Sequence, residues 1–174
     1  MVFWLVVAAG GGWAGEFPPE LPEPRANNPV ARAVGNDGAL WFTGLGLTGD
    51  KTQADLRADG WWIHDGDEAW RPLPPLPAFE GLAGRLGSHA VALAGELYVI
   101  GGYTVAGDHT ERSTPGVYRL VRNANPRWHL ATRMPVPVDD AVALVHRDRA
   151  LVALQPNHCG FSVPVALRGK APCA

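Results

Sequence analysis

Lysine is nearly absent from this chain of 174 residues. Lys51 and Lys170 are the only two, and the arginines are scattered along the sequence rather than clustered. The formal net charge is −2 at pH 7. Proteins that bind nucleic acids concentrate positive charge on one surface, so this pattern argues against a nucleic acid as a partner.

Long apolar runs are also scarce. One opens the chain over residues 1–14, and it is too short for a bilayer-spanning helix, which needs about 20 apolar residues. Gly12 and Ala14 stand where the small residues of a cleavage site belong, so we predict a secretory signal peptide over residues 1–15 and a periplasmic or secreted protein. The usual basic start is missing, and the alternative is a buried first strand.

Cysteine occurs twice, as Cys159 and Cys173, both within residues 155–174. An oxidising compartment would permit a disulfide between them, and the alternative is two unpaired thiols. His158 beside Cys159 lacks the second pair of ligands that a zinc site requires. We therefore predict no metal site and no cofactor.

A repeated pattern of short strands is the main feature that the chain does contain. Residues 88–103 predict two strands around a tight Ala94-Gly95 turn, closed by Gly101 and Gly102. Similar patterns occur about 57 residues earlier and about 51–53 residues later, a period typical of propeller blades. The alignment pairs Ala33-Val34 with Ala90-Val91, Leu40-Trp41 with Leu97-Tyr98, and Ala90–Leu93 with Ala141–Leu144.

The full unit predicts four strands, near residues 88–93, 96–101, 116–121 and 127–131. Gly101 and Gly102 can adopt dihedral angles closed to other residues and allow close approach of backbones. Large side chains should fill the space between neighbouring blades, namely Tyr118 and Trp128, with Trp70 aligned one unit before Trp128.

This combination resembles the kelch repeat, and in particular the exported bacterial kelch proteins known as galactose-oxidase-like. Further residues support the resemblance: Arg85 and the segments 101–105, 111–115 and 134–144. It implies an all-β fold of kelch-type β-propeller blades, each with four antiparallel strands. The sequence departs from the family where Gly44-Leu45-Gly46 replaces the first glycine pair, and where the third unit stops after its second strand.

The resemblance divides the chain into consecutive parts. After the signal peptide we expect a proline-rich lead-in at 16–29, blade 1 at 30–78, blade 2 at 79–136, the first half of blade 3 at 137–154 and a divergent tail at 155–174. A propeller ring needs at least four blades, so we expect an open, incomplete ring, truncated from a longer propeller. Its open blade faces would permit self-association.

Candidate ligand-binding residues lie in the predicted loops of one rim: Arg85, Tyr103, Glu111, Asp139 and Asp140. Arginine suits carboxylates, including those of sugar acids, although a bridge from Arg85 to Asp139 or Asp140 is the favoured alternative. Tyr103 opens a long loop over residues 103–116 and could stack on a sugar ring, although a solvated loop is the favoured alternative. The adjacent aspartates could bind a cation or share a proton, but bonds from loop amides are the favoured interpretation.

No complete catalytic constellation is visible, and the copper ligands of galactose oxidase match no positions here. We therefore predict a noncatalytic binding module that presents rim loops to a carbohydrate or protein. The first alternative is a sugar-acid epimerase, such as a sialic acid mutarotase, that would use Arg85, Glu111 and Asp139. The second is a fragment with no independent function.

Overall fold

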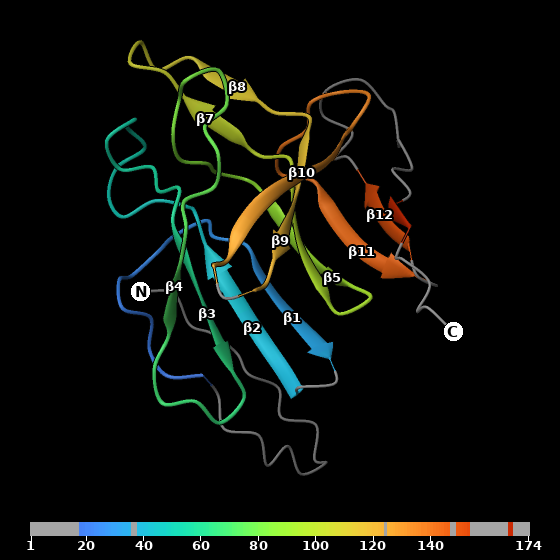
Figure 1. Ribbon diagram of the computed structural model, residues 1–174. Helices are drawn as coiled ribbons and strands as arrows, with labels where there is room; N and C mark the ends of the chain where they lie inside the picture. The colour runs from blue at the N-terminus through green and yellow to red at the C-terminus, as the bar shows by residue number, and fades with distance from the viewer. Residues whose placement is uncertain (1–17, 36–37, 124, 147–148, 154–166, 169–174) are drawn as a thin grey trace, which may run out of the picture.

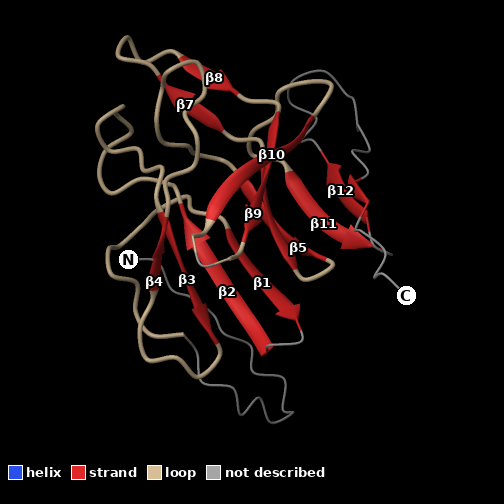
Figure 2. Ribbon diagram, in the orientation of Figure 1, coloured by secondary structure: helices blue, strands red, loops and turns tan. Residues whose placement is uncertain are grey.

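The computed structural model describes residues 18–35, 38–123, 125–146, 149–153 and 167–168. These residues form strands and loops and no helix (Figure 2), and so include no helix that could cross a membrane. The strands are β1 (Val30–Gly35), β2 (Gly38–Gly44), β3 (Gly60–His64), β4 (Arg71–Leu73), β5 (His89–Leu93), β6 (Glu96–Ile100), β7 (Tyr103–Val105), β8 (Glu111–Ser113), β9 (Gly116–Val121), β10 (Arg127–Arg133), β11 (Val142–His146), β12 (Arg149–Ala153) and β13 (Leu167–Arg168).

Two four-stranded antiparallel meanders make up most of the fold. The first sheet has the order β1-β2-β3-β4, and the second has the order β5-β6-β9-β10. The predicted all-β fold class, with blades of four antiparallel strands and no closed ring, is confirmed. The predicted long loop after β6 contains a separate hairpin, β7–β8. In the third sheet β12 pairs with the short β13, although the sequence predicts that the repeat ends after its second strand.

The hairpin between β5 and β6 turns at Ala94 and Gly95, as predicted. Both residues have positive φ, 51° and 75°. Positive φ at both central positions is the requirement of a type I′ turn, whose twist matches that of the two flanking strands.

The register of the repeat differs by one residue from the predicted alignment. Gly35 pairs with Gly38 where β1 meets β2, and Leu93 pairs with Glu96 where β5 meets β6, so the two units are related by a shift of 58 residues. Leu40 therefore corresponds to Tyr98 rather than to Leu97. Because successive side chains of a strand point to opposite faces, this single residue decides which neighbouring sheet each side chain contacts.

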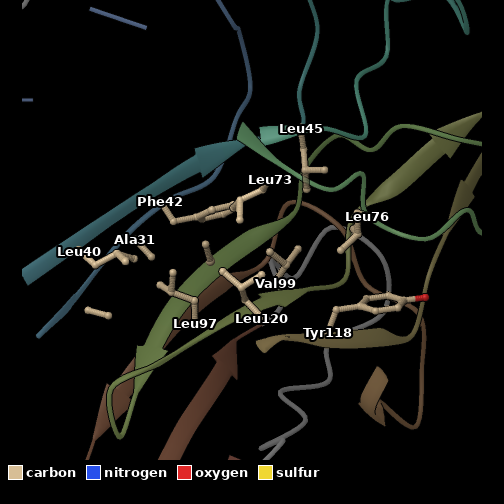
Figure 3. Close-up of a cluster of buried hydrophobic side chains, with 12 residues drawn as sticks. Ala31, Leu40, Phe42, Leu45, Leu73, Leu76, Leu97, Val99, Tyr118 and Leu120 are labelled. Atoms are coloured by element: carbon tan, nitrogen blue, oxygen red, sulfur yellow. The ribbon is translucent and has the colours of Figure 1, made fainter. Parts of the chain in front are cut away.

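The sheets pack face to face, with their first strands β1, β5 and β11 adjacent (Figure 1). Apolar side chains of the first two sheets form one shared core (Figure 3): Ala31, Ala33, Leu40, Phe42, Leu45, Leu73, Leu76, Ala90, Leu97, Val99, Tyr118 and Leu120. A second core joins the second and third sheets: Val91, Leu93, Tyr98, Ile100, Val117, Met134, Val138, Ala141, Ala150 and Val152. Each sheet thus buries a face only by stacking on the next, as propeller blades do.

The tryptophans aligned in the sequence have different surroundings. Trp128 lies in β10, and its indole meets the ring of Phe42 edge-on, with centroids 5.7 Å apart. Trp70 precedes β4, and its indole N–H donates a hydrogen bond of 2.8 Å to the carbonyl of Pro19. The segment before β1 therefore contacts the first sheet beside its last strand, β4.

Candidate functional site

A groove of about 750 Å³ runs across one end of the three sheets. Residues 25–30, 87–90 and 140–142 line it, and each segment leads into the first strand of a sheet. We call it the rim groove. Because β1, β5 and β11 are adjacent, the ends of three strands that are distant in the sequence meet there.

Two polar residues of the groove are held in place by hydrogen bonds. The Asn28 amide donates to the Thr43 hydroxyl at 2.7 Å. The Ser88 hydroxyl donates to the Gly101 carbonyl at 3.1 Å. These bonds fix both side chains at the starts of β1 and β5, so the groove has ordered polar walls.

His89 and Asp140 are the groove residues best placed to contact a ligand. His89 is half-buried, and its burial lowers the pKa of the imidazole, which favours the neutral form. Asp140 is exposed. Across the described ranges, no hydrogen bond or ion pair involves the side chain of either residue. The groove therefore offers one imidazole and one carboxylate to a bound molecule.

Gly87 and Asp140 connect the second and third parts of the groove. The Asp140 N–H donates to the Gly87 carbonyl at 2.9 Å. Gly87 has φ of 58°, and a Cβ on it would lie 2.6 Å from an Asp140 carboxylate oxygen. The backbone angle favours glycine here, and a Cβ would displace the Asp140 carboxylate from its position on the groove.

Arg25 stabilises the wall formed by the lead-in. Its side chain is fully buried and pairs with Glu23 at 2.7 Å and Asp59 at 3.1 Å. Its guanidinium lies 4.5 Å from the centre of the Trp61 ring. Both carboxylates offset its charge, so Arg25 fixes the lead-in against the first sheet rather than attracting an anionic ligand.

Arg85 does not line the rim groove. It is 2 % exposed, its guanidinium lies 5.6 Å from the centre of the Tyr118 ring, and Nη2 donates to the Pro77 carbonyl at 3.2 Å. Burial lowers its pKa. Nε and Nη1 have no hydrogen-bond partner among the residues that the structure describes.

The favoured bridge from Arg85 to an aspartate is wrong. No ion pair joins Arg85 to Asp139 or Asp140 in the described part of the chain. Asp139 instead accepts a hydrogen bond from the Ser113 hydroxyl of β8, while Asp140 lies on the groove. The two aspartates therefore have different surroundings.

Tyr103 does not offer an open ring for stacking on a sugar. It is 6 % exposed, packs with Leu86 and Val105, and has the Lys51 ammonium 4.9 Å from its ring centre. Lys51 also pairs with Glu111. Within the described ranges, no hydrogen bond or ion pair joins Arg85, Glu111 and Asp139, the residues predicted for an epimerase site.

His89 was not among the candidate ligand-binding residues predicted from the sequence. The available signal was its position at the start of a predicted strand, directly after the loop that leads into the second unit. Cys159, Cys173 and the predicted signal peptide lie outside the described residues. Among the residues described, no group of three or more His, Cys, Asp and Glu side chains is arranged to hold a metal ion.

A second hollow of about 410 Å³ lies between the first two sheets, at the end where β3 and β9 finish. Trp62 and His64 form one wall, and Leu120 and Pro126 contribute to the other. His64 Nδ1 is buried without a hydrogen-bond partner among described atoms. The hollow is smaller than the rim groove and involves only two sheets.

Comparison with known proteins places the chain by its fold. No family profile and no curated protein sequence matches it. Among solved structures, one described as "Structure of YjhT" matches with a TM-score of 0.59 and 22 % sequence identity. The match covers 78 % of this chain and 36 % of that one, so the chain spans about a third of its length. The shared feature is the fold. In this chain it is a propeller-like stack of antiparallel sheets, two of them four-stranded, and the described residues do not close into a ring.

Proposed function

We propose that the chain is a kelch-type binding module that holds a carbohydrate in the rim groove. The observation that supports this function is the meeting of His89 and Asp140 with ordered polar walls in one groove. Its volume is in the range of small-molecule sites, which combine a concave surface with a few well-placed polar groups.

The chemistry of the groove suits a neutral polyol. A carboxylate accepts hydrogen bonds, and a neutral imidazole both donates and accepts, so the two side chains match the hydroxyl groups of a sugar. The apolar floor is small, formed by residues such as Ala90 and Ala141. No Trp, Tyr or Phe is among the described residues that line the groove. Hydrogen bonds rather than ring stacking should therefore provide the affinity.

Heteronuclear NMR with a panel of monosaccharides and short glycans tests this proposal. A bound glycan should shift the amide resonances of residues 25–30, 87–90 and 140–142. Asp140→Asn and His89→Ala should each weaken binding by about tenfold, the loss expected for one buried hydrogen bond. Asp108→Asn removes the same charge from the exposed hairpin and should bind like wild type. The absence of shifts in these segments with every glycan would disprove the proposal.

A second candidate is a sugar-acid mutarotase, which the neutral state of His89 favours. Interconversion of anomers needs a group that takes the proton of the anomeric hydroxyl and returns a proton to the ring oxygen. A neutral imidazole can do both in turn. NMR exchange spectroscopy of sialic acid anomers should then show faster interconversion with wild type than with His89→Ala. Equal rates in both samples and in buffer would exclude this activity.

Export to the periplasm or the cell exterior remains a proposal that rests on residues 1–15. Fractionation of cells that express the full chain tests it, with a soluble cytoplasmic enzyme as the marker. Recovery of the protein with that marker would contradict export.

A further inference from the structure

We call the first strand of each stacked sheet (β1, β5 and β11) its inner strand. The inner strand β5 has one face toward the preceding sheet and one toward the following sheet. In β5, Ala90 belongs to the core shared with the first sheet, while Val91 and Leu93 belong to the core shared with the third. In β1, Ala31 and Ala33 face the second sheet. Inner strands thus bury small apolar side chains wherever a neighbouring sheet is present.

Among the described residues, two faces at the ends of the stack have no neighbouring sheet. We call the outward side of β1 the head face, with Val30 55 % and Val34 65 % exposed. We call the outward side of β11 the tail face, with Val142 53 % and Leu144 48 % exposed. These four residues are among the most exposed large apolar side chains of the described chain. Apolar side chains gathered on a strand face in this way mark an interaction surface.

The lead-in covers part of the head side. Arg25 lies over Trp61 of β3, and Asn28 bonds to Thr43 of β2. Trp61 and Thr43 are consequently 8 % and 3 % exposed. The exposure of the head side is therefore concentrated on the inner strand, which is the strand that contacts the next sheet within the chain.

We propose that the tail face of one copy of this chain docks on the head face of a second copy. The contact would continue the relationship that β1 has with β5 and β5 has with β11. In both of those contacts, the face of one sheet that points toward the later part of the chain meets the face of the next sheet that points toward the earlier part. The adjacent strands run in the same direction (Figure 1). Two tail faces meeting each other would instead place β11 against a reversed copy of itself, an arrangement that the chain does not use internally.

Head-to-tail docking has two consequences for the molecule. Unlike faces generate rings when the rotation closes, and open filaments when it does not. Val30 and Val142 also line the rim groove, so docking would join the grooves of two copies end to end. A ligand longer than one groove could then contact both copies.

Sedimentation velocity of the full chain from about 5 to about 200 μM tests the docking, because association follows mass action. The average mass should rise with concentration above that of one chain. Val34→Asp and Leu144→Asp should each abolish this rise, since a buried carboxylate would face an apolar surface. Val136→Asp is the matched control, because Val136 is 42 % exposed and lies outside both faces.

An equimolar mixture of Val34→Asp and Leu144→Asp distinguishes the geometry. Each variant retains one intact face, so the mixture should form a complex of two chains and nothing larger. Circular dichroism spectra that match wild type establish that the variants are folded. A wild type that stays monomeric, association that survives Val34→Asp, loss of association in Val136→Asp, or a monomeric mixture would each overturn the proposal.

Discussion

The indole nitrogen of Trp128 donates a hydrogen bond of 2.9 Å to the carbonyl oxygen of Pro74, which directly follows β4 of the neighbouring sheet. Its ring also meets Phe42 of that sheet, with an interplanar angle of 75°. One side chain thus joins two sheets through both a polar and an aromatic contact. The interface between the sheets is therefore specified in orientation as well as in apolar area.

Trp128→Ala should lower the free energy of unfolding by about 3–5 kcal/mol, because it opens a cavity between the sheets and leaves the Pro74 carbonyl unpaired. Trp128→Phe should lower it less, since a ring remains. Chemical denaturation measures both values. Leu130→Ala, at a position 37 % exposed in the same strand, provides the control. An equal loss of stability there would contradict a special role of Trp128 in joining the two sheets.

Gly101→Ala and Gly102→Ala should both destabilise the second sheet. Their φ angles are 59° and 88°, and a Cβ would lie 2.4 Å from the Val138 carbonyl oxygen and 2.1 Å from the Ser88 hydroxyl oxygen. Gly66→Ala isolates the backbone effect, because its φ is 87° and no atom lies within 4 Å of the added Cβ.

Thermal and chemical unfolding should show a loss of about 1–2 kcal/mol for Gly66→Ala. The substitutions at Gly101 and Gly102 should add a further ~1–3 kcal/mol from overpacking. Gly101→Val should prevent the second unit from folding, because β-branched residues do not tolerate positive φ. Equal losses at all three glycines would show that the close contacts are not important.

Arg85→Met should change the free energy of unfolding by no more than about 1 kcal/mol, or increase it, because it removes a buried charge with no carboxylate partner in the described part of the chain. Arg85→Ala should lower it by about 2–5 kcal/mol, since it leaves a cavity beside Tyr118. Chemical denaturation of the two variants gives the comparison. Severe destabilisation by Arg85→Met would point to a counter-charge that Arg85 needs.

His89 should make the fold less stable in mild acid. Its pKa in the folded state is lowered by burial, so below its ordinary pKa the unfolded chain binds more protons than the native chain does. The contribution of this group to stability is therefore complete above pH 6.5 and is lost as the pH falls toward the folded pKa. Unfolding measured from neutral to mildly acidic pH should show a shallower decline in His89→Gln. His129→Gln, at an exposed position, should decline like wild type, and identical curves for all three proteins would contradict this effect.

Local signals explain why so much of the fold could be predicted. Short apolar runs between turn residues predict strands, and Ala94-Gly95 predicts the hairpin turn that the structure contains. The hairpin β7–β8 was expected to be a loop, because Glu111 and Arg112 give it no alternation of apolar residues. Its strands are instead stabilised by pairing with each other and by ion pairs such as Arg112 with Glu80.

The candidate site was harder to predict, because its residues become neighbours only after three sheets have stacked. Asp140 was identified from its position in a loop. That the two aspartates have different surroundings depends on Ser113 of the inserted hairpin, which binds Asp139 alone. Arg85 and Tyr103 were expected on the surface for the same positional reason. Both are buried by packing from other units, at 2 % and 6 % exposed.

Strand content and the repeat follow from the order of residues alone, because turn dihedral angles and two-residue alternation are properties of neighbouring positions. The side on which each residue lies does not follow from that order. A shift of 57 or 58 residues fits the amino acids almost equally well, but only the latter matches the strand pairs Gly35–Gly38 and Leu93–Glu96. Burial of apolar faces between stacked sheets selects the register, and with it the groove that His89 and Asp140 line, because this free energy is gained only between distant segments.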